Sequence, residues 1–208
     1  STKRRIIMNK GLLIVVSAPS GCGKGTILRE ILKDDRYYYS VSATTREPRD
    51  KEIDGVHYQF YSKEKFEKLV SEGCMLEYAE YCGNYYGTRG DIVEEMRNKG
   101  KDVILEIEVQ GAMNVMKKCP EAVSIFILPP SVKELERRLR KRGTEEEDVI
   151  QKRLSKSVDE IHHASEYKYI IVNDALEDAV DDFKAVIKAE RLKAEYAGEI
   201  LDEVVKNA

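Results

Sequence analysis

The sequence predicts an α/β fold in which a parallel sheet is flanked by helices. Two continuous apolar runs, residues 12–17 and 123–128, are typical of strands that are buried on both faces of a parallel sheet. A glycine-rich turn and a helical stretch from residue 24 to about residue 32 follow the first run directly. This succession of strand, loop and helix is the usual opening of an α/β domain.

Length and composition narrow the class of protein. The chain has 208 residues, of which 42% are hydrophobic and 35% are charged, a balance typical of a globular protein with a core. The longest apolar run, residues 12–16, is far shorter than the roughly 20 residues that cross a bilayer. Because no segment resembles a signal peptide either, we expect a cytoplasmic protein with no membrane partner. The net charge of −3 argues against a nucleic-acid partner.

The residues that usually bind metals are poorly placed for it. The four cysteines lie far apart and form no Cys-x-x-Cys pair, which argues against a zinc knuckle or a thiol redox motif. His162 and His163 are adjacent, so on a helix their side chains point in different directions. The sequence therefore predicts no metal site built by the protein alone.

The pattern divides the chain into six segments. We expect a flexible amino terminus at 1–10, a core at 11–40 that carries the glycine-rich loop, an insertion at 41–90, and more core at 91–130. An arginine-rich helical excursion follows at 131–157, and core with C-terminal helices at 158–208, where 178–207 is predicted as one long charged helix. The insertion has alternating aromatic residues and a short helical piece at 62–72, which predicts a small mixed α/β unit with antiparallel strands.

Capping signals set several helix boundaries. A helix at 91–100 is expected to end at a glycine. Ser131 with Glu134, and Thr144 with Glu147, have the spacing of capping boxes that begin two helices. Residues 169–172 form the last predicted strand.

The stretch 102–109 alternates between apolar residues on one side and a side that includes Glu106 and Glu108. The two carboxylates are therefore expected to share one face at the end of a strand. Carboxylates are rarely placed in so apolar a strand without a partner, so this pair predicts a binding function.

The loop at residues 18–26 has the core of a phosphate-binding loop, Gly21-x-Gly23-Lys24. Glycines let the backbone N–H groups wrap a phosphate, the next helix directs its positive end at the anion, and the lysine adds charge. The pattern departs from the usual motif at Ala18 and Gly25. The residues expected to bind ATP here are Ala18, Ser20, Gly21, Cys22, Gly23, Lys24, Gly25 and Thr26.

Gly25 carries no hydroxyl, so the direct Mg²⁺ ligand that many such loops use is missing. We expect no direct protein ligand for Mg²⁺. The ion is expected near Thr26, on phosphate oxygens and waters, with Glu106 or Glu108 holding those waters.

A second anion site is predicted in the insertion. Arg46 and Arg49 flank a proline that restricts the backbone, and arginine forks bind phosphate through two hydrogen bonds at once. Tyr58, Tyr85 and Tyr86 supply hydroxyl donors and a stacking surface, with core packing as the equal alternative for Tyr85 or Tyr86 taken singly.

Together these motifs resemble the guanylate kinase family, over nearly the whole chain from residue 11 to about 188. The resemblance is carried by four stretches, Ser42-Ala-Thr-Thr-Arg-Glu-Pro-Arg49, Glu52 to Tyr58, Gly83-Asn-Tyr-Tyr-Gly87 and Glu106-Ile-Glu-Val-Gln-Gly111. It implies a P-loop nucleoside monophosphate kinase fold with a GMP-binding insertion at 41–90 and a lid at 131–157. The family often has Asp where this chain has Glu106 and Glu108, which leaves open how the two divide their work between Mg²⁺ water and GMP.

The resemblance also implies residue roles. Arg46, Arg49, Tyr58 and Tyr86 hold the GMP phosphate or stack near the base, and Ser42, Glu77 and Thr88 read the guanine. Glu52, Glu106 and Glu108 complete the implied GMP-binding set. The implied catalytic residues are Lys24, Arg46 and the lid arginines Arg138, Arg142 and Arg153. Asn173 matches a position that contacts the adenine of ATP.

The implied reaction is Mg²⁺-dependent transfer of the γ-phosphoryl group of ATP to GMP. Three alternatives remain: a kinase for another nucleoside monophosphate or phosphosugar, a guanylate kinase-like module that binds protein ligands without catalysis, and, least supported, nucleic-acid binding. Glu77 and Ser42 favour guanine over the first, and the intact Gly23-Lys24 pair argues against the second. The charged helix at 178–207 is explained equally well as a contact for self-association into a homo-oligomer and as a solvated helix face.

Overall fold

The computed structural model describes residues 10–141, 147–196 and 198–206. Its central sheet has five strands in the order β2-β7-β1-β8-β9. Their bounds are β1 (Leu13–Ser17), β2 (Tyr37–Tyr39), β7 (Asp102–Glu106), β8 (Val123–Leu128) and β9 (Tyr169–Val172). Every neighbouring pair is parallel, which confirms the predicted parallel sheet and places all five carboxyl ends at the same edge.

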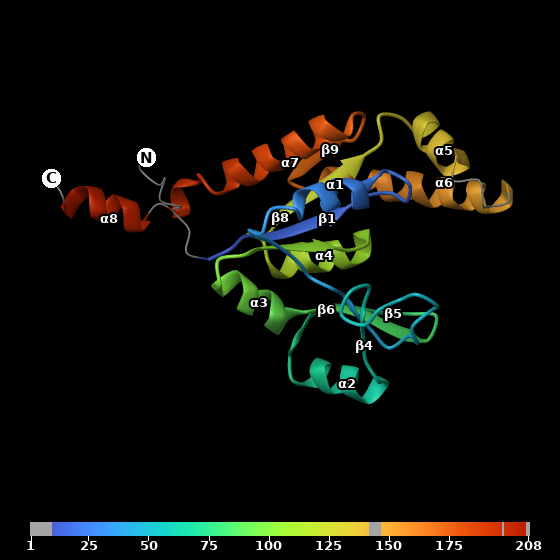
Figure 1. The fold of residues 1–208 in the computed structure, drawn as a ribbon, viewed down its shortest axis with the longest axis horizontal. Coiled ribbons are helices and arrows are strands. Elements are labelled where there is room, and N and C mark those ends of the chain that lie inside the picture. The colour runs from blue at the N-terminus through green and yellow to red at the C-terminus, as the bar shows by residue number, and fades with distance from the viewer. Residues whose placement is uncertain (1–9, 142–146, 197, 207–208) are drawn as a thin grey trace.

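Helices cover both faces of this sheet (Figure 1). The odd and even residues of β1 point to opposite layers, as a strand buried on both faces requires. Ile14 and Val16 pack with α1 (Lys24–Ile31) and α7 (Leu176–Glu190). Leu13 and Val15 pack with α3 (Gly90–Asn98) and α4 (Val109–Lys118). The continuous apolar run in the sequence thus reflects a strand with no solvent-facing side.

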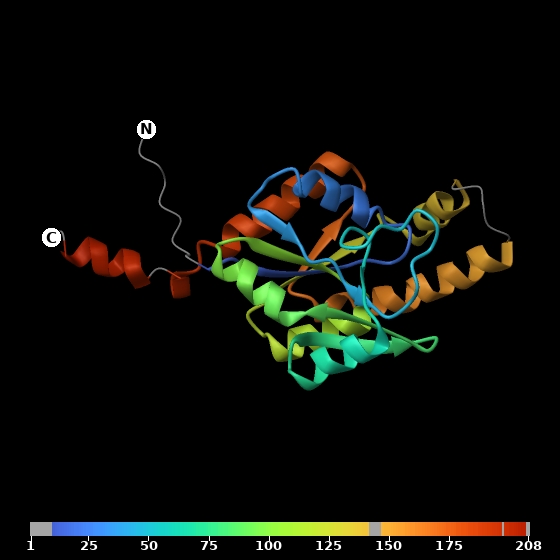
Figure 2. The same ribbon diagram turned by 60° about the horizontal axis from the view of Figure 1, so that its bottom comes forward.

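Residues 43–89 form a second, smaller sheet with its own helix, on the side of α4 (Figures 1 and 2). The strand order is β4-β3-β6-β5, with bounds β3 (Ala43–Thr44), β4 (Gln59–Phe60), β5 (Met75–Tyr81) and β6 (Asn84–Arg89). The pairs β3–β6 and β5–β6 are antiparallel as predicted, whereas β3–β4 is parallel. Helix α2 (Lys63–Ser71) begins where the Ser62 hydroxyl accepts a hydrogen bond from the Lys65 N–H.

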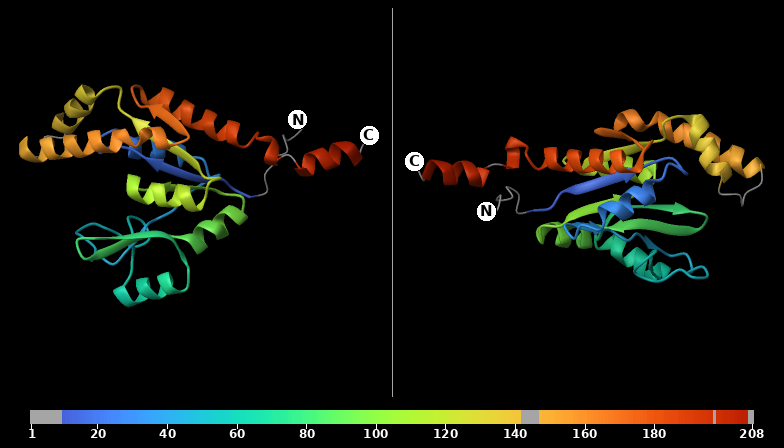
Figure 3. Two further views of the ribbon diagram at one scale, coloured as in Figure 1. Left: turned by 180° about the vertical axis from the view of Figure 1, so that it is seen from behind. Right: turned by 45° about the horizontal axis from the view of Figure 1, so that its top comes forward.

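Helices α5 (Val132–Lys141) and α6 (Glu147–His162) project from the body as a helical arm (Figures 1 and 3). The Ser131 hydroxyl accepts from the Glu134 N–H at 3.1 Å, so the predicted cap begins α5. The Glu134 carboxylate instead pairs with Arg137 and Arg138. A short 3₁₀ turn, η1 (Ala164–Glu166), leads from α6 to β9. The other predicted cap, Thr144, lies outside the described residues.

The prediction of one long C-terminal helix at 178–207 was wrong. Helix α7 ends at Glu190, a 3₁₀ turn η2 (Ala194–Tyr196) follows, and α8 (Gly198–Lys206) is a separate helix. Helix α8 extends away from the end of the molecule opposite the helical arm (Figures 1 and 3). The C-cap residue of α7 is Arg191, whose side chain pairs with Asp102. Among the described residues, no helix is both long and apolar enough to cross a membrane.

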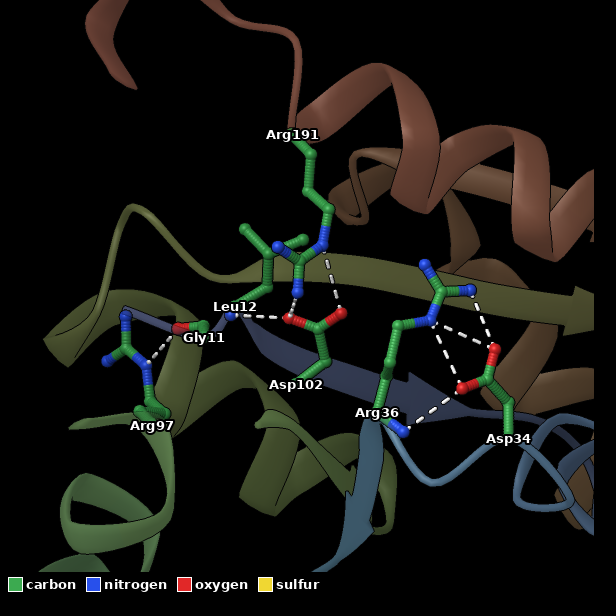
Figure 4. A network of polar contacts seen from close by, with 7 residues as sticks. All are labelled: Gly11, Leu12, Asp34, Arg36, Arg97, Asp102 and Arg191. Carbon is green, nitrogen blue, oxygen red and sulfur yellow. Dashed lines mark hydrogen bonds and ion pairs between the residues drawn. The ribbon is translucent and has the colours of Figure 1, made fainter. Parts of the chain in front are cut away.

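A buried network ties the amino-terminal ends of the strands together (Figure 4). Asp102, at the start of β7, is 1% exposed, and its carboxylate accepts from the Leu12 N–H at 2.8 Å and from the Arg191 guanidinium at 2.5 and 3.1 Å. Beside it, the Arg97 side chain donates to the Gly11 carbonyl at 3.0 Å. The C-terminal end of α7 and the first strand are thereby fastened at the edge of the sheet away from the phosphate loop.

Candidate active site

The predicted phosphate loop, residues 18–26, connects the carboxyl end of β1 to the first turn of α1. Gly21 and Gly23 have φ angles of 92° and 84°, a backbone conformation that glycine adopts without strain. A Cβ atom on Gly23 would also lie only 2.5 Å from the Asn173 side-chain nitrogen. The conformation of the loop therefore requires glycine at positions 21 and 23.

Two hydrogen bonds of Asn173 support the loop. The Asn173 side chain donates to the Cys22 carbonyl at 2.6 Å, and the Arg138 guanidinium donates to the Asn173 carbonyl at 3.0 Å. The Cys22 side chain is fully buried, which raises the pKa of its thiol to about 12. Cys22 therefore contributes its backbone to the loop, while its sulfur is unreactive core. Asn173, which was expected to contact adenine, is 7% exposed, and its side-chain amide donates its hydrogen bond to the loop backbone.

Lys24 faces the carboxyl end of β7. Its ammonium lies 3.4 Å from Glu106 Oε1, and the Tyr39 hydroxyl donates to Glu106 Oε2 at 3.0 Å. Burial raises the pKa of Tyr39, and the Glu106 carboxylate and Tyr58 raise it further, so the phenol stays a proton donor. Tyr39, at the end of β2, went unrecognised in the sequence because its partner is 67 residues away.

Glu106 and Glu108 do not share a strand face, contrary to the expectation. Strand β7 ends at Glu106, which is the last residue paired with β1, and Glu108 is the N-cap residue of α4. The chain turns between them, where the Ile107 carbonyl accepts a hydrogen bond from the Ser17 hydroxyl at 2.8 Å. The two carboxylates consequently have different partners: Glu106 pairs with Lys24, and Glu108 pairs with Lys156 on α6.

In the insertion, Glu52 holds the two predicted arginines. Its carboxylate accepts from the Arg46 guanidinium at 2.8 Å and from the Arg49 backbone N–H at 2.7 Å. These hydrogen bonds lower the pKa of Glu52 to about 2. Arg46 also lies over the ring of Tyr58, 5.5 Å from its centroid. Glu52 thus orients Arg46, and the Arg49 side chain extends from a backbone that Glu52 restrains.

The structure separates the two adjacent tyrosines of β6. Tyr85 stacks on Phe66 of α2 with ring centroids 5.3 Å apart, so it packs inside the insertion. Tyr86 points to the other side and meets Tyr58 edge-on at 6.1 Å. Tyr86, and not Tyr85, therefore belongs to the cluster around Arg46.

Glu77 is a buried carboxylate on β5. It is 7% exposed, and its Oε1 accepts from the Thr88 hydroxyl of β6 at 2.8 Å. Burial raises the pKa of Glu77, against the hydrogen bond from Thr88. Ser42, the third residue expected here, precedes β3 and is half-buried, and its carbonyl accepts from the Gln59 N–H. The structure thus brings Glu77 and Thr88 into direct contact.

The helical arm brings arginines to the phosphate loop. Arg138 reaches it through Asn173, and Arg153 of α6 donates to the Ser20 hydroxyl. Arg142, the third predicted arginine, lies outside the described residues. The phosphate loop therefore has contacts from both arm helices.

Two hollows adjoin the phosphate loop. The first, of about 300 Å³, lies between the loop and α6 and is lined by Ala18, Ser20, Lys24, Glu108, Arg153, Lys156 and Glu160. The second, of about 290 Å³, is lined by residues 18–26 and Arg29. Lys156 and Glu160 went unrecognised in the sequence, although their spacing from Arg153 already places all three on one helix face.

Within the described part of the chain, no group of three or more His, Cys, Asp or Glu residues is placed to hold a metal ion. The four cysteines are free thiols.

The model of the family described as guanylate kinase matches residues 10–190 of this chain. The chain belongs to the guanylate kinase family. Guanylate kinases are also its relatives in sequence: it is 54% identical over 187 residues to that of Carboxydothermus hydrogenoformans, covering 89% of this chain and 92% of the relative. That of Desulfitobacterium hafniense is 52% identical over 186 residues, covering 89% and 93%.

The fold agrees with that of a solved guanylate kinase, from Anaplasma phagocytophilum. The TM-score is 0.70 with 36% sequence identity, and the match covers 89% of this chain and 88% of that one. The likeness confirms the P-loop nucleoside monophosphate kinase fold that the motifs imply.

Proposed function

We propose that this guanylate kinase transfers the γ-phosphoryl group of ATP to GMP, giving ADP and GDP. One observation carries the proposal: a line of contacts joins the phosphate loop to the insertion. Lys24 pairs with Glu106, which accepts from Tyr39. The pKa of Tyr39 is raised mainly by burial, and Tyr58 of the insertion raises it further. A donor held by the loop and an acceptor held by the insertion would therefore meet over Glu106.

On the donor side, the backbone of residues 18–26 binds the ATP phosphates and Lys24 neutralises their charge. Arg138 and Arg153 add cations from the arm, and Arg142 is assigned the same role from its sequence position. The arm, residues 131–157, acts as a lid that closes over ATP and excludes water, since water in an open site would hydrolyse the nucleotide. Asn173 serves ATP mainly by supporting the loop.

On the acceptor side, Arg46 and Arg49 bind the GMP phosphate, with Tyr58 and Tyr86 alongside. Glu52 orients Arg46 through their 2.8 Å hydrogen bond and is a positioning residue in this assignment. Arginine is suited to this role because its planar fork matches two phosphate oxygens at once.

Guanine is read by Glu77, with Thr88 and Ser42 beside it. An ionised carboxylate only accepts hydrogen bonds, and guanine offers N1–H and an exocyclic amine, whereas adenine has no donor at N1. Thr88 donates to Glu77 Oε1 and fixes the carboxylate. A Cβ on Gly111 would lie 3.1 Å from Glu77 Oε2, so glycine at this position keeps that oxygen accessible.

Mg²⁺ fits this site as an ion bound mostly by phosphates and waters. The described residues hold no cluster of protein ligands for it, and Mg²⁺ commonly keeps several waters and uses one or two carboxylates. Glu106, beside Lys24, is the carboxylate best placed to hold such waters, near Thr26 at the start of α1. When bound, Mg²⁺ would neutralise charge on the phosphates of ATP.

The chemistry needs no general base. A phosphate monoester has a second pKa of about 6, so the GMP phosphate is largely dianionic at neutral pH. One of its oxygens forms the new bond to the γ-phosphorus while the bond to the bridging β,γ-oxygen breaks and ADP leaves. Catalysis then consists of positioning and charge neutralisation.

The test is ADP formation from Mg-ATP with GMP, dGMP, AMP, CMP and UMP offered separately, beside a sample without acceptor. We expect turnover that depends on GMP. Turnover with another acceptor alone would remove Glu77, Ser42 and Thr88 from base recognition. No turnover with any of the five, in a folded sample that still binds GMP, would identify a binding module.

A further inference from the structure

Helix α6 presents three charged residues to the cavity beside the phosphate loop. Arg153, Lys156 and Glu160 are spaced by three and four positions, so they follow one another along one helix face. All three line the 300 Å³ cavity that Lys24 also lines. The proposed function already assigns Arg153 to the ATP phosphates, whereas it gives Lys156 and Glu160 no role.

The contacts of Lys156 are loose. Its ammonium lies 3.5 Å from Glu108 Oε2 and 3.6 Å from Glu160 Oε1, beyond the 2.7 to 3.2 Å of well-formed hydrogen bonds. The side chains of Lys156 and Glu108 are 62% and 81% exposed, and exposed ion pairs of this kind are held weakly. Lys156 can therefore change partners at little cost.

The charges around the cavity favour an anion as the new partner. Its lining contains three cations, Lys24, Arg153 and Lys156, and two carboxylates, Glu108 and Glu160. A triphosphate carries more negative charge than either carboxylate and presents several oxygens to an ammonium. Burial raises the pKa of Glu160, and Glu108 raises it further, against the pull of Lys156 and Lys24.

We propose that Lys156 is a further phosphate-binding residue of the transfer site, held beside the cavity by Glu108 and Glu160 until a nucleotide phosphate replaces them. The inference rests on the proposed function and adds a binding residue to it. Lysine suits the task because its compact ammonium follows a single phosphate oxygen, while the arginines bind oxygens in pairs. Since Glu108 begins α4 and Lys156 lies on α6, the exchange also removes one ion pair between the arm and the core.

The first test is ATP binding by calorimetry without an acceptor, with Lys156→Ala, Lys156→Arg and Lys152→Ala. Losing one charge-assisted contact should weaken ATP binding about 10- to 100-fold in Lys156→Ala, and Lys156→Arg should restore most of it. Lys152 lies one turn earlier on α6, is exposed and does not line the cavity, so Lys152→Ala should stay within about twofold. Thermal unfolding of each variant should match that of the parent protein.

Two results would overturn the assignment. ATP binding within about twofold of the parent in Lys156→Ala would make Lys156 a solvated surface charge. An equal loss in Lys156→Arg, together with a lowered melting temperature, would make its role structural. Because the measurement needs no acceptor, it stands apart from the GMP turnover that tests the proposed function.

A double-mutant cycle tests the holding role of Glu160. If Glu160 competes with phosphate for Lys156, Glu160→Gln should tighten ATP binding about two- to threefold in the parent and leave it unchanged in Lys156→Ala. An equal gain in both backgrounds would mean that Glu160 acts on the phosphates through the general field of the cavity, and would contradict the exchange.

Discussion

The two edges of the central sheet use the same residue types in opposite ways. At the amino-terminal edge, Asp102 is 1% exposed and holds Arg191 at 2.5 Å and the Leu12 N–H at 2.8 Å. At the carboxyl edge, the shortest contact between Lys24 and Glu106 is 3.4 Å, and their side chains are 20% and 28% exposed. The charged pair at the first edge is buried and tightly hydrogen-bonded, whereas the pair at the second edge is partly exposed and loosely paired.

This difference indicates which charged side chains can exchange their partner for a ligand. A buried pair with short hydrogen bonds cannot be exchanged for a ligand, because breaking it leaves a charge without water or a partner. In a loose, partly exposed pair each charge is stabilised little by its partner and can turn to a phosphate instead. Mutations at the amino-terminal edge should therefore change stability, and mutations at the carboxyl edge should change binding and turnover.

The largest effect on turnover is expected at the carboxyl edge. Lys24→Ala removes the cation that we propose neutralises the ATP phosphates, and losing one such group costs about 10²- to 10³-fold in kcat. Steady-state turnover with Mg-ATP and GMP measures the loss, and calorimetric melting should show an unchanged fold. Retained turnover would contradict the assignment of the phosphate loop.

Asp102→Ala should give the largest loss of stability. It leaves Arg191 without its carboxylate and the Leu12 N–H without its acceptor, and breaking a buried pair costs about 3 to 5 kcal/mol. Denaturant unfolding measures the loss, with KM for both nucleotides unchanged in the folded fraction. The matched control is Asp34→Ala, which breaks the neighbouring exposed pair with Arg36 and should cost about 1 kcal/mol or less (Figure 4). Equal losses in the two variants would remove the contrast.

Glu77→Gln separates stability from recognition at one residue. The amide presents a donor where guanine needs an acceptor, so the preference for GMP over AMP in kcat/KM should fall about 10- to 100-fold. Because burial raises the pKa of Glu77 in the folded chain, ionisation of this group costs stability as pH rises through that pKa. The neutral variant should therefore be at least as stable at pH 7. Unchanged selectivity would remove Glu77 from the base pocket.

The same shift predicts a pH dependence. In the proposed assignment Glu77 binds GMP in its ionised form, so GMP affinity should fall as pH drops through the raised pKa, at a higher pH than for an ordinary glutamate near 4.5. The GMP phosphate also protonates below pH 6, and Glu77→Gln serves as the control because it shares that loss. Parallel pH profiles for the two proteins would contradict the prediction.

The smallest effect is expected in the helical arm. Ser131→Ala removes the hydroxyl that accepts from the Glu134 N–H, a cap worth about 1 kcal/mol. We expect hydrogen exchange to quicken in the first turn of α5 with little change in turnover. Ser131→Asp should restore protection, and exchange that stays equally slow in Ser131→Ala would exclude the cap.

Local patterns predicted the elements of the core well. The apolar runs became β1 and β8, and Ser131 caps α5, because burial on two faces and capping act over a few residues. Two local predictions were wrong for a tertiary reason. The strand with Glu106 ends where its pairing with β1 ends, and the C-terminal helix ends where Arg191 turns to Asp102.

By itself, the sequence determined the chemistry that this chain carries: a glycine loop with Lys24, a pair of arginines around a proline, and carboxylates that only accept. Only the tertiary structure decided which of these groups meet. Tyr39 reaches Glu106 across 67 positions, and Lys156 reaches Glu108 across 48, so nothing in their neighbours along the chain indicates the contact. Covalent neighbours set the residue types and the helix and strand periods, but partners brought together by folding set which charges stay fixed and which remain free to bind phosphate.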